Sequence, residues 1–299
     1  MEIKRFINRV EKRFNPPRED VLTILPCSAK KPYSTSKSHK IFERGIKSRG
    51  EEIIITSPLG VVPREIEMIY PAQHYDISVI GVWTEDEKER IRRCLDSYID
   101  KKSYRKIIVH VNNELKKICN DVLKDKNIDL VFTSEGTDPR SKKAINQLDE
   151  ELNGFETREN PYLDVFKGIL DYQFGPKAGD LGSLGNLHIK GNYPKLKLLN
   201  DNNDQIATLV PQYGSLAFTI DAAQKIIPPD YRVKIDKFHP KGSVLAPGVV
   251  NSGTKIRPND EVFFEGEKSI GVGRAKMGSS EMMESNRGIS IKVRHSKKR

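Results

Sequence analysis

Short apolar segments alternate with helical ones in the first half of the chain, and this alternation most constrains the possible folds. Five segments are expected as strands: Val21–Leu25, Ile53–Thr56, Ile77–Ile80, Ile107–Val111 and Ile128–Thr133. They are rich in β-branched residues and lack the polar alternation of half-exposed strands, as expected for strands buried on both faces. Such strands, separated by helices, form a parallel sheet.

The intervening segments carry apolar residues at helical spacing and begin with residues that favour helix starts. A first helix is expected over residues 1–14, ahead of Pro16-Pro17. The other expected helices are Ser38–Ser48, Pro63–Tyr70, Glu85–Ile99, Asn113–Lys124 and Pro139–Leu152. The pattern therefore predicts an α/β domain over residues 1–155, with three layers and a parallel sheet in the middle.

The pattern changes after Asn153-Gly154. Tyr162–Phe174 is expected as a helix, and a glycine-punctuated stretch follows it. Strands are then expected at Ala207–Val210 and Ala217–Ile220, with a helix at Asp221–Ile227. We therefore expect a small α+β domain over residues 156–229.

Strands dominate the last part of the chain, residues 230–299. They are expected at Arg232–Ile235, Asp260–Phe264, Ser269–Ala275 and Ile289–Val293, separated by Gly and Pro, which predicts a small β-barrel. The segment resembles a PUA domain, a module that usually binds structured RNA. The resemblance rests on Gly242–Gly248, Arg257–Val262, Gly271–Ala275 and Arg287–Ile289.

The charge is concentrated in this last segment. Residues 231–299 hold 15 Lys and Arg against 7 Asp and Glu, whereas the first 230 residues hold 36 against 34. A basic end on a near-neutral body favours a polyanion bound at that end. Arg274, Lys276 and Arg287 are the candidates for phosphate contacts, and the alternative for each is a solvated surface charge.

Cysteine usage and hydropathy limit the cellular setting. The three cysteines, Cys27, Cys94 and Cys119, form neither a CxxC pair nor an even ladder, which favours a reducing compartment. Cys94 and Cys119 lie at helical spacing among apolar residues and are expected in the core. No apolar stretch is long enough to span a membrane, and the N-terminus is too charged for a signal peptide. We therefore expect a cytoplasmic protein.

The connection after the first expected strand has the most unusual composition in the chain. It runs from Pro26 to His39 as PCSAKKPYSTSKSH, whereas a plain connection of this type has about two to six residues. A thiol, several hydroxyls, two adjacent lysines and an imidazole fall within it. Because ligands gather at the carboxyl ends of parallel strands, this loop is the first candidate for a site.

The loop also resembles the archaeosine synthase signature PCSxxKPYxxSxSH. The matching residues are Pro26, Cys27, Ser28, Lys31, Pro32, Tyr33, Ser36, Ser38 and His39. The resemblance continues through residues 57–83 and the Tyr172–Gly175 region into the PUA-like segment. It implies an enzyme that acts on tRNA carrying 7-cyano-7-deazaguanine in the D-loop and adds an amine, lysine, to the nitrile. A partner radical SAM enzyme then cleaves the product.

One feature departs from that family. Its full-length members begin with a transglycosylase-like barrel bearing a zinc-cysteine cluster, and this sequence contains neither. We therefore expect a shortened form that works with a separate barrel subunit. No P-loop, GxGxxG motif or metal-ligand spacing is present, so no nucleotide cofactor or metal is expected, and lysine is the expected co-substrate.

The reaction that the resemblance implies suggests roles for the loop residues. Cys27, with a lowered pKa, is expected to attack the nitrile as a thiolate; the alternatives are a small buried residue and direct attack by lysine. His39 is expected to move protons or to brace the following helix. Ser28, Ser36 and Ser38 bind substrate or cap a helix, and Lys31 pairs with the substrate carboxylate or is a solvated charge.

Residues elsewhere complete the predicted site. The acids Asp76, Glu135 and Asp138 are expected to hold an amino group, or to brace loops. The aromatic residues Tyr33, Tyr75 and Trp83 are expected to stack on a flipped base, or to pack in the core. Two functions stay open on these grounds: a tRNA-modifying transferase, and a non-catalytic subunit that delivers tRNA to a transglycosylase.

Overall fold

The computed structural model describes residues 2–75 and 83–299, and the chain divides into two compact units. The first unit comprises residues 1–179 with 212–214, and the second comprises residues 180–211 and 215–299. The expected domain boundaries at 155 and 229 stay a prediction.

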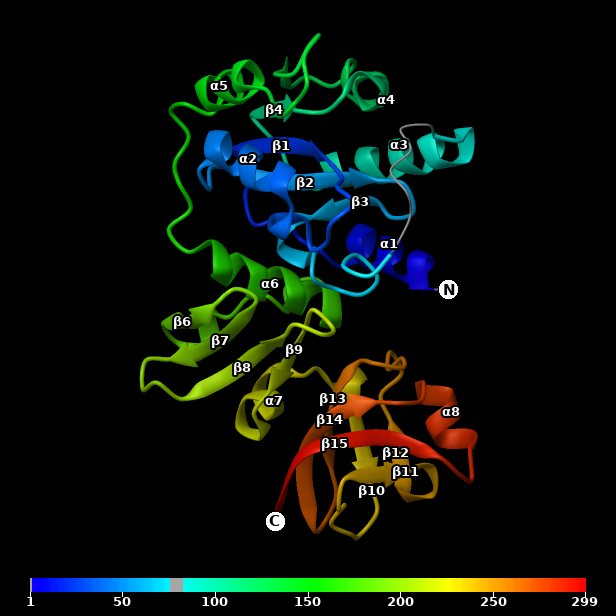
Figure 1. Cartoon of the computed structure of the whole chain (residues 1–299). Coiled ribbons are helices and arrows are strands. Elements are labelled where there is room, and N and C mark those ends of the chain that lie inside the picture. Colours follow the sequence, from blue (N-terminus) through cyan, green and yellow to red (C-terminus); the bar gives the residue numbers. More distant parts are fainter. Residues whose placement is uncertain (1, 76–82) are drawn as a thin grey trace. The chain divides into compact units, whose positions relative to one another are not determined.

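A five-stranded sheet forms the centre of the first unit (Figure 1). Its order is β3-β2-β1-β4-β5, in which the pairs β2–β1, β1–β4 and β4–β5 are parallel and β2–β3 is antiparallel. The strands are β1 (Val21–Pro26), β2 (Glu51–Thr56), β3 (Gly60–Pro63), β4 (Lys106–Val109) and β5 (Asp129–Phe132). The α/β class with a parallel-sheet region is thereby confirmed.

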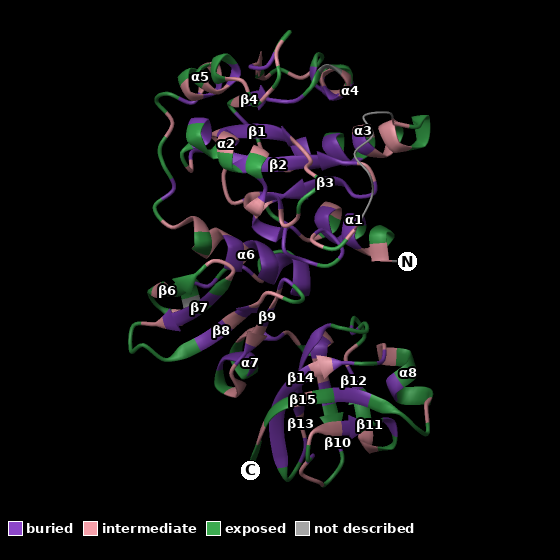
Figure 2. Cartoon of the chain, in the orientation of Figure 1, coloured by how far each residue is buried: buried purple, intermediate pink, exposed green. Residues whose placement is uncertain are grey.

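Burial follows the apolar runs that predicted the strands. β1 and β2 are buried along almost their whole length (Figure 2): Val, Ile and Leu make up most of β1 and the middle of β2, and Glu51 and Glu52 at the start of β2 are buried as well. β1 occupies the middle of the sheet, and its carboxyl end leads into the loop of residues 27–36.

The helices of the first unit are α1 (Glu2–Lys12), α2 (Lys37–Ile46), α3 (Glu85–Ile99), α4 (Asn113–Leu123), α5 (Lys142–Glu151) and α6 (Pro161–Phe174). α2 packs against α5, and α3 packs against α4 and α1. The expected three-layer arrangement stays a prediction. Within the two described ranges, no helix is long and apolar enough to cross a membrane.

The helix expected over Pro63–Tyr70 is wrong. Pro63 instead ends β3 (Gly60–Pro63), and only a short 3₁₀ turn, Arg64–Ile66, follows it. The chain folds back here because Gly60 adopts a φ of 70°, where a Cβ would lie 2.6 Å from the Cys94 sulfur. The strand expected at Ile77–Ile80 lies outside the described residues.

The second unit contains two sheets. The first is an antiparallel sheet of β6 (Leu187–Asn192), β7 (Lys195–Asn200), β8 (Gln205–Val210) and β9 (Ser215–Phe218), followed by α7 (Ile220–Ile226). The β6–β7 hairpin was not predicted. β9 ends at Phe218 rather than Ile220, because Thr219 caps α7.

The second sheet has six strands in the order β11-β15-β14-β13-β10-β12. These are β10 (Arg232–Ile235), β11 (Ser243–Leu245), β12 (Val249–Ser252), β13 (Glu261–Glu265), β14 (Ser269–Ala275) and β15 (Ile289–Lys298), with α8 (Ser279–Glu284) before β15. Its closure into a barrel stays a prediction.

One arginine links the two sheets of the second unit. Arg294 of β15 donates to both carboxylate oxygens of Glu261 and, over 2.9 Å, to the Phe218 carbonyl at the end of β9. Glu261 also accepts from the Phe218 amide at 3.4 Å. Phe218, at the end of the four-stranded sheet, is therefore bound to the six-stranded sheet through both its backbone amide and its backbone carbonyl.

Candidate active site

The carboxyl edge of the five-stranded sheet brings Cys27 beside the end of β2. Pro26 pairs with Ile55 in the parallel register, so Cys27 and Thr56 are the next residues along the two strands. Cys27 is half-buried. The loop after it passes through a 3₁₀ turn, Tyr33–Thr35, before α2 begins.

Three hydroxyl groups form a chain beside this thiol. The Tyr75 hydroxyl is hydrogen bonded to both the Tyr33 hydroxyl and the Thr56 hydroxyl. Tyr33 is fully buried and Tyr75 is half-buried. Burial raises the pKa of Tyr75 to about 12 and that of Tyr33 well above its ordinary value. Both phenols are therefore protonated at neutral pH and can only donate or relay protons.

Lys31 is the cation of the site. Its ammonium group lies 3.9 Å from the centre of the Tyr75 ring, within the range of a cation–π contact. The expectation that Cys27 has a lowered pKa is wrong. Burial raises the pKa of the thiol, and the Lys31 charge and a hydrogen bond with Thr56 lower it by less. The free protein therefore holds Cys27 mainly as the thiol.

Replacing Lys31 with methionine is expected to raise the pKa of Cys27 further, because the nearby positive charge stabilises the thiolate. The pH midpoint of iodoacetamide alkylation, followed by mass spectrometry of the Cys27 peptide, should move upward. Lys30→Met removes the exposed neighbouring charge and serves as the matched control. An equal shift in both variants would contradict a specific effect of Lys31.

His39 is buried, and both of its ring nitrogens are occupied. Nε2 lies 3.0 Å from the Pro26 carbonyl and Nδ1 lies 2.8 Å from Nη2 of Arg64. Because the carbonyl only accepts and the guanidinium only donates, the ring is neutral, with its proton on Nε2. Burial, and then the Arg64 charge, hold the pKa of His39 well below its usual range. The ring is thus placed to fix the end of β1 immediately before Cys27.

This geometry makes His39 a positioning residue, and its expected role in proton transfer stays a prediction. Turnover is expected to show no inflection from His39 between pH 6.5 and 8, because a lowered pKa keeps the ring neutral throughout that window. His39→Leu, which removes both hydrogen bonds, should reduce turnover by up to about a hundredfold. His39→Gln, which keeps a donor and an acceptor, should recover part of it. A His-type inflection lost in both variants would instead support proton transfer.

A buried ionic network supports the loop from behind. Arg64 donates to Glu52 at 2.8 Å and to Glu67 at 2.9 Å, and Glu67 accepts from the Ser34 amide at 3.0 Å. Arg158 extends the network by pairing with Glu52 at 3.2 Å and with Glu65 at 2.9 Å. Burial opposes ionisation of Glu52, but the two guanidiniums outweigh it and lower its pKa.

The three predicted serines have local partners. Ser36 caps α2 by accepting from the His39 amide at 3.2 Å, and Ser38 lies 3.2 Å from the Ser36 hydroxyl. Ser28 is half-buried and donates to the Lys30 carbonyl at 2.9 Å. Capping thus accounts for Ser36, while the expected substrate contacts of all three stay predictions.

The two predicted acids that the structure describes, Glu135 and Asp138, are paired with other residues. Glu135 is exposed after β5, the edge strand two positions from β1, and pairs with Lys116. Asp138 pairs with Arg140 at 2.5 Å, and its hydrogen bonds with Arg140 lower its pKa to about 2. Asp76 lies outside the described residues. Trp83 is half-buried directly before Thr84, the cap of α3.

The predicted RNA-contacting residues lie in the six-stranded sheet of the second unit. Lys276 and Arg287 are exposed. Arg274 is half-buried, and its Nε donates to the Asn259 carbonyl at 3.2 Å. Arg274 lies in β14, Lys276 follows that strand and Arg287 precedes β15; their contact with phosphates stays a prediction.

Sequence reasoning missed Thr56, Arg64 and Glu52. Thr56 is one of many hydroxyl residues and belongs to no recognisable motif. Arg64 and Glu52 cannot be distinguished in the sequence from the many other charged residues of the chain. His110 was missed as well. It is fully buried after β4, hydrogen bonded to Thr133 and the Pro139 carbonyl, each at 2.8 Å, and burial lowers its pKa to about 4.

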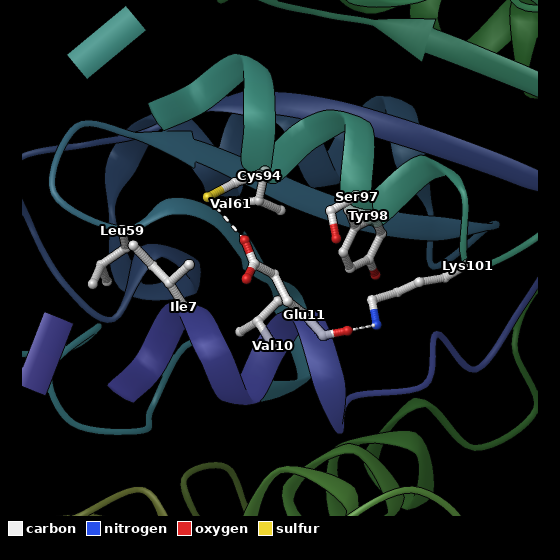
Figure 3. Close-up of a pocket in the computed structure, with 9 residues that line it drawn as sticks. All are labelled: Ile7, Val10, Glu11, Leu59, Val61, Cys94, Ser97, Tyr98 and Lys101. Carbon is white, nitrogen blue, oxygen red and sulfur yellow. Dashed lines mark hydrogen bonds between the residues drawn. The ribbon is translucent and has the colours of Figure 1, made fainter. Parts of the chain in front are cut away.

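A small cavity of the first unit lies away from this edge (Figure 3). It opens between α1 and α3 beside β3 and is lined by Val10, Val61 and Tyr98, among others. Cys94 faces Glu11 across it at 4.0 Å, and burial raises the pKa of Cys94 to about 11. Its size suits about one water molecule, and no residue of the Cys27 loop lines it.

Three family models match consecutive parts of the chain. Residues 3–152 match a domain of unknown function, DUF5591. Residues 165–229 match the patch-forming domain C2 of tRNA-guanine transglycosylase, and residues 236–297 match the PUA domain. The fold and site thus define a multidomain class in which a DUF5591 α/β domain, with Cys27 at its sheet edge, precedes a transglycosylase-type C2 domain and a PUA domain.

The relatives narrow this class to one family. The chain is 42% identical to the archaeosine synthase subunit alpha of Methanosarcina acetivorans, over 100% of the chain and 50% of the relative. It is 44% identical to the archaeosine synthase of Haloferax volcanii, over 100% of the chain and 52% of the relative. The chain belongs to the archaeosine synthase family. It spans about half the length of these curated relatives.

A solved structure covers nearly the same extent. The crystal structure of AF0587, a protein of unknown function, is similar with a TM-score of 0.80 and 32% identity. The match covers 99% of this chain and 98% of that one. The arrangement of an α/β domain followed by the β-rich domains therefore recurs in a second chain of the same extent.

Proposed function

We propose that this chain is a tRNA-modifying transferase of archaeosine biosynthesis. It joins an amine of lysine to the nitrile of 7-cyano-7-deazaguanine in the D-loop of tRNA. One observation carries the proposal: Cys27 lies at the sheet edge beside the hydroxyl of Thr56, in a loop that also holds Lys31 and Tyr33. A nucleophile with a nearby cation and a hydroxyl chain suits addition to a nitrile.

The addition would proceed through a thioimidate. The sulfur of Cys27 bonds to the nitrile carbon, one π bond of the nitrile breaks, and the nitrile nitrogen takes a proton. Because the thiol pKa is raised, its proton must leave as the sulfur attacks. The Thr56–Tyr75–Tyr33 chain supplies hydroxyls through which a proton can pass to the nitrogen.

Lysine would complete the transfer. Its neutral amine attacks the thioimidate carbon, the carbon–sulfur bond breaks, and the thiol is regenerated with one of the amine protons. The product is an amidine that links lysine to the base. The half-buried position of Cys27 limits water access, and water would otherwise hydrolyse the thioimidate.

A labelling assay tests the proposal. Purified protein, tRNA bearing the nitrile base and labelled lysine should yield labelled tRNA, whereas tRNA with guanine at the same position should stay unlabelled. The same assay is repeated with a transglycosylase-like barrel protein added. Absence of label in both settings would refute the transferase.

A second function is favoured by the C-terminal half alone. The matches to a transglycosylase C2 domain and a PUA domain suit a subunit that holds tRNA for a separate transglycosylase. Such a subunit would bind tRNA tightly yet give no label, and it would raise the activity of the transglycosylase. A partner radical SAM enzyme acting on the product is part of the first proposal only.

A further inference from the structure

Two helices at the candidate active-site edge begin with lysine instead of an acid. α2 starts at Lys37 and α5 starts at Lys142, and neither has an acidic residue in its first turn. Every other α-helix within residues 2–75 and 83–299 carries an acid there. A cation at a helix N-terminus opposes the helix dipole, so local stability does not account for these lysines.

The two helices lie side by side and run in the same direction. The Gly45 backbone of α2 lies against Ile145 of α5, and Lys47 pairs with Asp149 at 2.6 Å near the carboxyl ends of both. Since α2 follows β1 and α5 follows β5 in a parallel sheet, both first turns lie at the edge that holds Cys27. The exposed cations along them form what we call the α2–α5 ridge: Lys37, Lys40, Arg44, Lys142 and Lys143.

Within the described part of the chain the ridge cations have no carboxylate partner, unlike the cations of α3. On α3, Lys88 pairs with Glu85 at 2.8 Å and Arg92 pairs with Glu89 at 3.4 Å. Among the described residues, no carboxylate lies within 4.0 Å of a ridge cation. The one carboxylate of α2, Glu43, instead accepts from the Ser48 amide and hydroxyl. The ridge thus presents five exposed cations that the described carboxylates do not pair with.

The near-neutral charge of the first 230 residues conceals this surface. Glu51, Glu52, Glu65 and Glu67 count as negative charges in the sequence, but each is at most 3% exposed. Arg64 and Arg158 form ion pairs with three of them inside the unit. Arg9, Arg49 and Arg158 are buried as well, so the net charge of the first 230 residues does not describe the local charge of the exposed surface.

We propose that the α2–α5 ridge binds backbone phosphates of the tRNA whose base reaches Cys27. This inference rests on the proposed function and adds to it a second RNA-binding surface, in the α/β unit itself. Lys37, Lys40 and Arg44 lie on one face of α2 and span about 10 Å along its axis. That length matches about three stacked nucleotides, and the first of the cations follows Ser36 in the same loop as Cys27.

The salt dependence of tRNA binding tests the ridge. The full chain and the double variant Lys37→Ala/Lys40→Ala are titrated with a tRNA transcript at several salt concentrations, by filter binding or fluorescence anisotropy. Each lost phosphate contact should reduce the slope of log K against log salt by about 0.7 to 0.9. The double variant should therefore show a slope smaller by about 1.5 and an affinity about tenfold lower at low salt. Lys37→Arg/Lys40→Arg should retain both.

The control removes the same charge elsewhere on the unit. Lys12→Ala/Lys124→Ala deletes two exposed lysines at the carboxyl ends of α1 and α4 and should leave the slope unchanged. If the ridge variant and the control bind tRNA alike, the ridge is refuted while tRNA binding by the chain stands. If the wild-type chain does not bind the transcript, both the ridge and the proposed function fail.

Discussion

Alanine in place of Cys27 is expected to abolish the transfer of labelled lysine to tRNA, with a loss of at least about a thousandfold. The reason is that the sulfur would form the bond that activates the nitrile carbon, and alanine offers no replacement nucleophile. Initial rates with saturating tRNA measure the effect. Cys94→Ser, which changes a thiol in the cavity between α1 and α3, is the matched control and should leave the rate nearly unchanged.

A covalent adduct gives an independent readout of the same step. When lysine is omitted, wild-type protein mixed with nitrile-bearing tRNA should form a complex that survives denaturing electrophoresis, and Cys27→Ala should not. Turnover near the wild-type rate in Cys27→Ala would rule the thioimidate out. Lysine would then attack the nitrile directly, and Cys27 would be a small residue packed at the end of β1.

Arg158→Met is expected to destabilise the first unit by about 3 to 5 kcal/mol, the range for breaking a buried ion pair from one side. The side chains of Arg158, Glu52 and Glu65 are only 5%, 4% and 0% exposed, so Glu65 would lose its buried partner and Glu52 would keep only Arg64. Urea unfolding followed by the fluorescence of Trp83, the single tryptophan, reports on this unit.

An exposed arginine provides the comparison. Arg140 pairs with Asp138 while its side chain is 58% exposed, and Arg140→Met should cost less than about 1 kcal/mol. If Arg158→Met cost no more than this, water would already share the charge of Glu65, whose second oxygen has no hydrogen-bond partner in the structure. The ion pairs of Arg158 would then be hydrated and would not support the loop rigidly.

Helices with strong end signals could be predicted closely from the sequence. α3 was expected at Glu85–Ile99 and forms there, because Thr84 and Glu87 make a reciprocal capping box ahead of an acidic first turn. The helix expected over Pro63–Tyr70 does not form, because the turn at Gly60 returns the chain along β2 and Pro63 pairs with Ile53 as part of β3. The β6–β7 hairpin was missed although Leu196 and Leu198 alternate with lysines as half-buried strands do.

The sequence predicted which loop holds the candidate site, but it did not predict which side chains contact one another there. The composition of residues 26–39 located the loop, and the structure brings Tyr33, Tyr75 and Thr56 together beside it. One of the two hydrogen-bond partners of His39 is Arg64, which lies 25 residues away along the chain and is not part of the local motif. The direction of the Cys27 pKa shift depends on burial, which is set by tertiary packing and is not encoded by the local motif.

The hydrogen bonds of Arg294 with Glu261 and Phe218 connect two parts of the chain that the family models separate. Family models divide the chain between residues 229 and 236, yet Arg294, Glu261 and Phe218 join the two sides of that division. α7 also packs on β13 and β14, and Lys297 pairs with Asp221 at 2.6 Å. Because one compact unit spans this division, we expect that cutting the chain between residues 229 and 236 would leave two fragments that do not fold independently.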